Sequence, residues 1–220
     1  MKKIQYKHPL TAQLEQAITW NHSGKMCGMA SLSTSVLLNP HCMERAKNPN
    51  SVCAKCYASR MMKHRKTLEK KLAKNTEVLT KNIISPEYFP IVNREKFRFE
   101  AFGDLNNYVQ VVNYFNFAKR NPRTTFALWT KNPWIIQEAI EKGYAKPKNL
   151  IVIFSSPTVN ACADNIRKLY TFIDKIFTVY TSEETAREQG KTINCGARNC
   201  VECGRCYSKR TNWEVNELLK

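Results

Sequence analysis

The chain has 220 residues, of which 43% are hydrophobic and 24% are charged, and this balance predicts a folded protein with a sizeable core. No apolar run approaches the roughly 20 residues that a transmembrane helix needs, so we expect no membrane span. Polar residues follow the first lysines where a signal peptide would have its apolar core. We therefore expect a cytoplasmic protein, in which cysteines bind metals more readily than they form disulfides.

The formal net charge is +17, from 35 lysines and arginines against 18 aspartates and glutamates. Basic residues concentrate between Lys55 and Lys74, a stretch with a single acid, Glu69. Such a field attracts polyanions, so nucleic acid or a phosphorylated substrate is one expected partner of this basic helix. The alternative is a solvated helix face on a generally basic protein.

In chain order, residues 16–21 predict a short strand. A loop follows from His22 to Cys56, and its length is plausible if a bound metal organises it. Good helix formers and apolar residues at mixed three-, four- and seven-residue intervals then predict one helix over 58–83.

From residue 97 onwards, strand and helix patterns alternate. The predicted strands are 97–102, 124–130, 150–154 and 176–180, and the predicted helices are 106–119, 133–142 and 164–174. This alternation indicates right-handed βαβ units and a parallel sheet. We therefore predict an α/β fold, either a partial (open) β/α barrel or a parallel sheet of about five strands, in a single α/β domain over 1–220.

Eight of the nine cysteines fall into two groups near the ends of the chain: Cys27, Cys42, Cys53 and Cys56, then Cys195, Cys200, Cys203 and Cys206. A C-x-x-C spacing turns both sulfurs to one side, and thiolates are the ligands that iron–sulfur clusters and zinc select. We predict an N-terminal metal-binding loop over 22–57 and a C-terminal four-cysteine loop over 194–207. The residues alone leave iron–sulfur and zinc open as the metal. His22 and His41 are possible nitrogen ligands, with a loop role as the alternative, and Cys162 stands alone, which predicts a small buried apolar residue.

Functional groups collect at the carboxyl ends of strands in both predicted architectures. This rule selects Gly103 and Asp104 after one strand and Lys131 after the next, with Asp104 and Lys131 as candidate catalytic residues. Asp104 is either functional or the cap of helix 106–119, and Lys131 either binds a carboxylate or phosphate or is a solvated charge. Both cysteine groups follow predicted strands, so we expect them at the same rim.

A metal-binding loop after a strand, ending in C-x-x-C-Y-A and followed by a helix, resembles radical S-adenosylmethionine (SAM) proteins. More narrowly, the chain resembles the phage-encoded gene product 88 family. The matching segments are Cys27, Cys42, Cys53–Ala58, Phe102–Leu105, Leu128–Asn132 and the four C-terminal cysteines.

The resemblance implies a [4Fe–4S] cluster held by three cysteines, with the fourth iron open to SAM, and one or two clusters in the chain. It implies a radical-SAM-type enzyme in the cytoplasm of a phage-infected host, with Tyr57 flanking SAM and Gly103 and Asp104 holding its methionine amine. A fourth thiolate from Cys27 would fill the open iron. An electron-transfer or structural iron–sulfur protein therefore stays an alternative, as does a zinc-stapled basic protein that binds nucleic acid.

Overall fold

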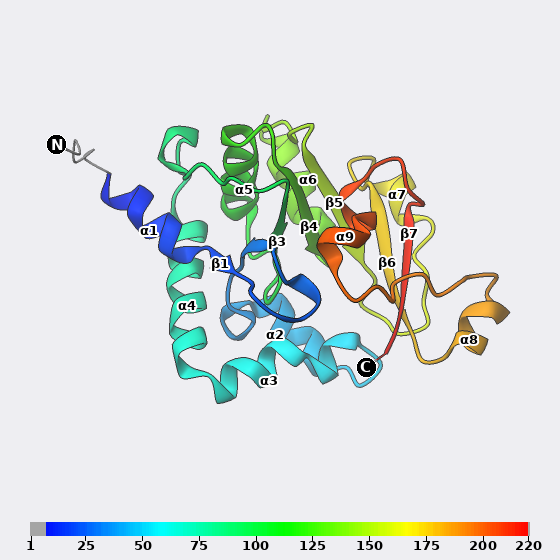
Figure 1. The fold of residues 1–220 in the computed structure, drawn as a ribbon. Helices are drawn as coiled ribbons and strands as arrows, with labels where there is room; N and C mark the ends of the chain where they lie inside the picture. Colours follow the sequence, from blue (N-terminus) through cyan, green and yellow to red (C-terminus); the bar gives the residue numbers. More distant parts are fainter. Residues whose placement is uncertain (1–7, 220) are drawn as a thin grey trace.

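The computed structural model describes residues 8–219, which form an α/β fold around one open sheet of seven strands, in the order β1 to β7 (Figure 1). The strands are β1 (Thr19–Trp20), β2 (Ala30–Leu32), β3 (Lys96–Phe99), β4 (Thr125–Thr130), β5 (Leu150–Ser155), β6 (Lys175–Tyr180) and β7 (Glu214–Leu218). Strand β1 pairs antiparallel with β2, and every later pair is parallel. The predicted fold class is confirmed, and the sheet is larger than the predicted five strands.

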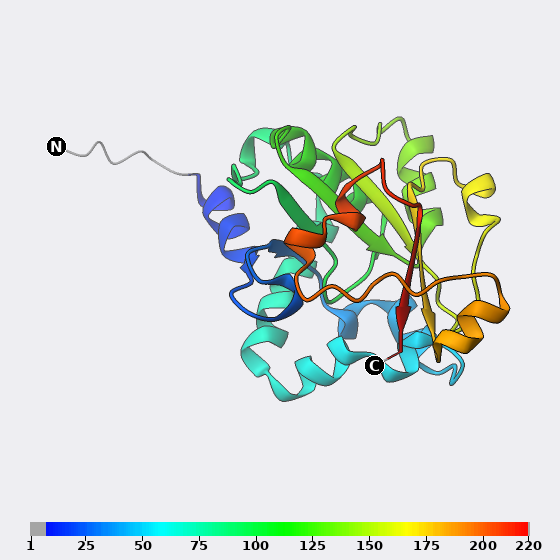
Figure 2. The same ribbon diagram turned by 45° about the vertical axis from the view of Figure 1, so that its right-hand side comes forward.

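Nine α-helices occur within residues 8–219. They are α1 (Pro9–Ala17), α2 (Pro40–Ala46), α3 (Tyr57–His64), α4 (Lys66–Lys81), α5 (Tyr108–Arg120), α6 (Pro133–Glu141), α7 (Ile166–Leu169), α8 (Glu183–Glu188) and α9 (Cys200–Cys203). Strands β2 to β7 are neighbours in sequence as well as in space. Successive right-handed crossovers of this kind place the connecting helices on the same face of a sheet. In Figures 1 and 2, α4, α5 and α6 lie on one face, and α9 with the last part of the chain crosses the other.

The helical face holds the larger apolar core because alternate strand residues point toward it. Phe99 of β3 stacks on Tyr114 of α5, with ring centroids 4.2 Å apart, and on Phe126 of β4 at 5.0 Å. Burying each such ring stabilises the fold by about 1.5–3 kcal/mol. The intervening β3 residues, Lys96 and Arg98, point to the opposite face, which the C-terminal segment covers. The helical face of the sheet is therefore filled by apolar side chains, whereas charged side chains such as these lie on the other face.

The second face carries a smaller apolar cluster. Met29, Ala127, Ile151 and Ile153 pack there against Tyr207. Strand β5 is buried along its whole length, because helices cover one side and the C-terminal segment covers the other.

Two helix predictions need correction. The single helix predicted over 58–83 is two helices, α3 and α4, separated at Arg65, whose backbone leaves the helical region. Met62 of α3 and Leu72 of α4 pack in the same cluster near the cysteine loop, whereas Leu79 of α4 joins the main core, so α4 extends from the one cluster to the other. The helix predicted over 164–174 is the single turn α7.

The predicted loop from His22 to Cys56 contains β2 and α2, and β7 was not predicted at all. Because β2 and β7 were not predicted, the cysteines lie at other places in the sheet than the sequence indicated. Cys42, Cys53 and Cys56 follow the carboxyl end of β2, whereas Cys27 precedes its amino end. The C-terminal cysteines lie between α8 and β7, on the face opposite the helices. The expectation that both cysteine groups share one rim is therefore wrong.

None of the helices in the described range 8–219 is long and apolar enough to cross a membrane.

Candidate metal centres

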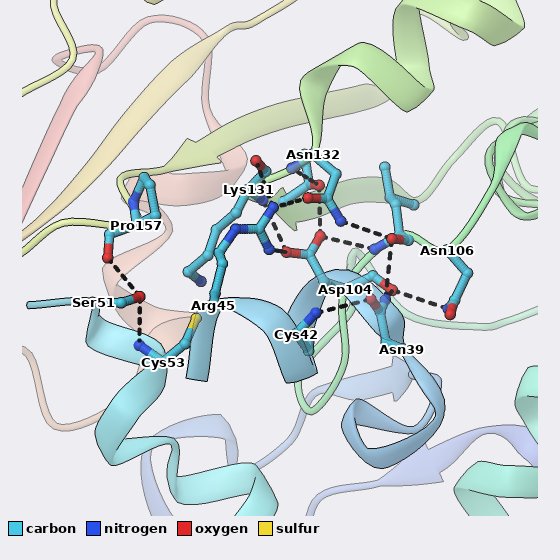
Figure 3. Close-up of polar contacts among 12 residues, drawn as sticks. Asn39, Cys42, Arg45, Ser51, Cys53, Asp104, Asn106, Lys131, Asn132 and Pro157 are labelled. Carbon is cyan, nitrogen blue, oxygen red and sulfur yellow. Dashed lines mark hydrogen bonds and ion pairs between the residues drawn. The ribbon is translucent and has the colours of Figure 1, made fainter. Parts of the chain in front are cut away.

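Three cysteines gather beyond the carboxyl end of β2; Cys42, Cys53 and Cys56 are called the rim group below. Cys42 lies in the first turn of α2, where its backbone N–H donates to Asn39 Oδ1 at 3.1 Å. The buried Asn39 side chain also donates to the carbonyls of Asp104 and Leu105, at 2.9 and 3.1 Å. One capping residue therefore fixes Cys42 against the end of β3 (Figure 3).

Cys53 lies in a short 3-10 helix, Val52–Lys55, and Cys56 is the single residue between that helix and α3. Ser51 Oγ accepts from the Cys53 N–H at 3.1 Å and donates to the Pro157 carbonyl at 3.1 Å, and Val52 N–H donates to the same carbonyl at 2.9 Å. The C-x-x-C turn is thus anchored to the segment that follows β5.

The structure brings the rim group together from these two anchors. Cys42 and Cys56 share one apolar cluster with Met62 and Leu72. The pKa of the Cys42 thiol is raised, first by burial and then by the Asp104 carboxylate, and Cys53 adds to the increase. Lys131 and Arg45 act in the opposite direction and favour the thiolate.

Asp104 ties the ends of β3 and β4 together. Its Oδ1 accepts from Thr130 Oγ1 at 2.6 Å and from Leu105 N–H at 2.8 Å, and its Oδ2 accepts from Lys131 N–H at 3.0 Å. The cap of α5 is Asn107, whose side chain accepts from Gln110 N–H, so Asp104 does not cap that helix. The Asp104 carboxylate is therefore a positioning group beside the rim group.

Arg45 and Lys131 bring positive charge to the same place. Arg45 Nη2 donates to the Lys131 carbonyl at 3.3 Å and to Asn132 Oδ1, and Nη1 lies 3.7 Å from Asp104 Oδ2. That Nη1 atom is buried and has no hydrogen-bond partner among the described residues. In Figure 3 the Lys131 side chain extends from the end of β4 toward the cysteine loop.

Tyr57 and Gly103 both lie at this rim. The Tyr57 hydroxyl donates to the Ala101 carbonyl, and its half-exposed ring packs near Phe102. A methyl group on Gly103 would lie 2.6 Å from both Glu100 Oε2 and the Thr34 carbonyl, so only glycine fits there. Gly103 is thus required by local packing, whatever its role toward a ligand.

Glu100, at the end of β3, was not singled out from the sequence. Its backbone has a φ of 54°, and its buried carboxylate accepts from Thr34 N–H at 3.2 Å, Thr34 Oγ1 at 3.1 Å, Gln110 Nε2 at 2.7 Å and the Tyr114 hydroxyl. Burial raises its pKa to about 7, against the lowering effect of the Tyr114 hydrogen bond. The sequence does contain a signal for Glu100. It is an acid directly after alternating aromatic residues, and the residues that follow it, Ala101–Gly103, offer no charge to pair with its carboxylate.

Cys195, Cys200, Cys203 and Cys206 lie on the segment that crosses the face opposite the helices; residues 194–207 are called the inner loop below. Asn199 caps α9, with its Oδ1 accepting from Val201 N–H at 2.7 Å. Cys200 and Cys206 pack against the apolar cluster around Tyr207. Burial, and then the other three cysteines of the loop, raise the pKa of the Cys206 thiol to about 12. The four thiols therefore lie within electrostatic reach of one another.

Positive charge also accompanies the inner loop. Lys25 Nζ lies 3.4 Å from Cys195 Sγ and 2.7 Å from Glu217 Oε1. The Arg98 guanidinium lies over the Trp129 ring at 4.1 Å. Burial raises the pKa of Cys200 and of Cys206, and the charge of Arg98 opposes part of that rise. Arg98 Nε is buried without a hydrogen-bond partner in the described part of the chain.

Cys27 lies with the inner loop and away from the rim group. Its carbonyl accepts from Asn199 Nδ2 at 3.3 Å, and the neighbouring Gly28 lies against Val201. The four N-terminal cysteines predicted as one set thus lie at two places, with Cys27 before β2 and the rim group after it. His41 lies in the first turn of α2, not in a loop, and packs edge-on against Trp134 at 5.7 Å.

A third cluster comprises Cys162, Asp164 and Glu214, whose ligand atoms all lie within 4.8 Å of one another. Lys191 Nζ already pairs with Asp164, at 3.2 Å, and with Glu214. The Cys162 thiol is partly exposed and donates to Asp164 Oδ1 at 2.8 Å, so the prediction of a buried apolar residue is wrong. Because a lysine already neutralises the carboxylates, we interpret this cluster as an ion-pair network.

Among residues 8–219, neither the rim group nor the inner loop has three thiol sulfurs within 4.8 Å of one another. A tetrahedral zinc site needs sulfurs less than about 4 Å apart, because each Zn–S bond is about 2.3 Å. An iron–sulfur cluster holds its cysteines farther apart, since each cysteine binds a different iron. Arg45 Nη1 and Arg98 Nε, which are buried and have no hydrogen-bond partner among residues 8–219, place positive charge beside the two cysteine groups.

A family model described as gene product 88 matches residues 7–216. No curated protein matches the chain, and no solved structure matches it.

Proposed function

We propose that this chain, which belongs to the gene product 88 family, is an iron–sulfur protein of the radical-SAM type. In this proposal the rim group holds a [4Fe–4S] cluster through three thiolates and leaves its fourth iron for SAM. Such a cluster, when bound, supplies the electron that cleaves SAM. The observation that carries the proposal is the separation of Cys27 from Cys42, Cys53 and Cys56, because it leaves three thiols at the rim.

The location of the rim group supports this reading. It follows the first parallel strand of the sheet and lies at the carboxyl ends of the strands, where β/α folds bind their ligands. Asn39 and Ser51 hold the two halves of the group, so the thiols are fixed by the fold. The buried Nη1 of Arg45 has an ion pair with Asp104 but no hydrogen-bond partner among residues 8–219, and an anionic cluster or its ligand would accept a hydrogen bond from it.

The residues around the rim group then take distinct roles. Tyr57 would line the SAM site, as its ring is half-exposed and its hydroxyl is anchored to Ala101. Lys131 would bind a carboxylate, since only its backbone N–H is engaged by Asp104. Asp104 and Gly103 would act by positioning, with Asp104 holding Lys131 and Arg45 in place.

For the inner loop we propose a second, fully ligated cluster bound by Cys195, Cys200, Cys203 and Cys206. Four thiolates close such a centre, so it serves electron relay or structural support. Lys25 and Arg98 offset part of its negative charge. Zinc bound by the same four thiolates is the alternative.

The test is SAM cleavage by anaerobically reconstituted, reduced protein. We expect 5′-deoxyadenosine from the native chain and from Cys27→Ala, and none from Cys42→Ala. Cys27→Ala is the matched control, because it removes a thiol of the N-terminal set that lies outside the rim group. Equal loss in both variants, or no product from native protein that holds its clusters, would contradict the proposal.

A further inference from the structure

We propose that the substrate of the rim group is single-stranded nucleic acid, whose phosphates bind along α3 and α4 and whose unpaired base stacks at Trp134 and Tyr57. This inference rests on the proposed function, because it names the substrate class for the same site. Its own evidence is the charge and the exposed aromatic rings that surround the cysteines.

Helices α3 and α4 present a basic surface that is almost free of acids. The exposed cations of this surface are Lys55, Arg60, Lys63, Arg65, Lys66, Lys70 and Lys74. Among the described residues, an ion pair is found for one of them, Lys66, with Glu69 at 2.9 Å. On α4, Lys66, Lys70 and Lys74 recur every four residues and therefore form one stripe. Such a row of exposed cations matches the regular charge of a phosphate backbone.

This basic surface begins at the rim group itself. Cys56 is the N-cap of α3, so the first exposed residues of that helix follow the last cysteine directly. In Figures 1 and 2, α3 lies beside α2 at the carboxyl ends of the strands, and α4 continues from it along the edge of the molecule. A strand bound along the two helices would therefore pass the candidate centre.

Exposed rings lie on the segments that surround the rim group. Tyr57 is 51% exposed and Trp134 is 45% exposed. Trp134 is held by His41 and by the Arg45 guanidinium, each 5.7 Å from its ring, and Tyr57 is held by its hydrogen bond to Ala101. Rings that are already fixed can stack on a base with little further loss of freedom. Bases in a duplex are already stacked on one another, which is why we infer a single strand or a loop.

The first experiment measures binding of a short fluorescein-labelled RNA, and of the DNA of the same sequence, to the reconstituted full chain. The variant is Lys63→Glu/Lys66→Glu/Lys70→Glu. Its matched control is Lys119→Glu/Arg120→Glu/Arg123→Glu, which changes the charge equally on exposed residues before β4, at the opposite ends of the strands. We expect the first variant to lose at least about tenfold in affinity and about 2 from the slope of log K against log salt.

The second experiment tests stacking with Trp134→Leu and the control Trp20→Leu. Trp20 is 43% exposed and has Arg94 at 5.2 Å from its ring, so the two tryptophans are closely matched. We expect about a tenfold loss of single-strand affinity for Trp134→Leu and none for Trp20→Leu. Tighter binding of a duplex than of the single strand would overturn the stacking model.

Equal losses in both charge variants would overturn the proposal, since the binding would then follow net charge alone. Absence of nucleic-acid binding by the native chain at low salt, or binding only to vesicles of anionic lipid, would do the same. Iron and sulfide are counted in every sample. Intact clusters with unchanged binding in the Lys63 variant reject this inference alone, whereas native protein without iron rejects the proposed function.

Discussion

The rim group and the inner loop are both cysteine-rich, yet the fold holds them in different ways. The segments of the rim group are fixed by other parts of the chain, through Asn39 to the end of β3 and through Ser51 to Pro157. The inner loop lies across the open face of the sheet, where Cys200 and Cys206 themselves pack in the small apolar cluster. The two groups also differ in exposure, since Cys42 of the rim group is buried and Cys203 of the inner loop is exposed. The comparison therefore separates a group fixed at the ends of the strands from one that covers a face of the sheet.

The largest difference that we expect is in thermal stability. Cys206→Ser should lower the melting temperature by about 10 °C, because a lost centre would release the inner loop from β4 and β5. Cys42→Ser should lower it by a few degrees, since Asn39 and Ser51 still hold the rim segments. Calorimetry under anaerobic conditions measures the melting temperature of each variant. Equal decreases in the two variants would contradict the expected difference between the inner loop and the rim group.

The second difference concerns the ion pair in each region. Asp104→Asn should destabilise the fold by about 3 kcal/mol, because it leaves the buried Arg45 guanidinium uncompensated. Glu217→Gln at the inner loop should change stability by less than about 1 kcal/mol, because its pair with Lys25 is partly exposed. Denaturant unfolding measures both, and a larger effect at Glu217 would contradict this ranking.

A third prediction concerns pH. Burial raises the pKa of Glu100 to about 7 from 4.5, so the folded state holds the proton more tightly than the unfolded state. Stability from this group is therefore fully present below about pH 4.5 and falls by about 3 kcal/mol as the pH rises through 7. Glu100→Gln should lack this fall. Parallel pH profiles for the native chain and the variant would show that Glu100 does not titrate in this range.

The smallest difference concerns two glycines. Gly103→Ala should cost about 2 kcal/mol, because the new methyl group meets Glu100 and Thr34 at 2.6 Å. Gly196→Ala in the inner loop should be neutral, since nothing lies within 4 Å of the added methyl group. Urea unfolding of both variants measures these effects. A Gly103→Ala variant as stable as the native chain would mean that the segment after β3 can shift to admit the methyl group.

The sequence predicted the centre of the sheet well and its ends poorly. Strands such as 150–154 and 176–180 are apolar enough to be found by pattern. Both faces of the first strand are buried, and one face of the second is buried along its length. Strand β2 has three residues, and β7 carries Asn216 and Glu217, whose polar side chains bind Thr192 and Lys25. Their partners are remote in sequence, so no local pattern indicates these strands.

The same limit applies to the candidate site. The strand-end rule placed Asp104 and Lys131 at the rim beside Cys42, because it depends on local pattern alone. Asn39 and Arg45 were missed, since their roles depend on contacts with residues 65 to 87 positions away. The division of Cys27 from the rim group was missed because β2, the strand that separates them, was missed.

The central claim is that the rim group forms one cluster without Cys27, and counting iron and sulfide per chain tests it most directly. Native protein, Cys27→Ala and Cys42→Ala/Cys53→Ala/Cys56→Ala are purified anaerobically and reconstituted side by side. We predict the same iron and sulfide content for the native chain and Cys27→Ala, and about half of it for the triple variant, with the inner loop still loaded. Zinc in place of iron, or an equal loss of iron in Cys27→Ala, would contradict the account.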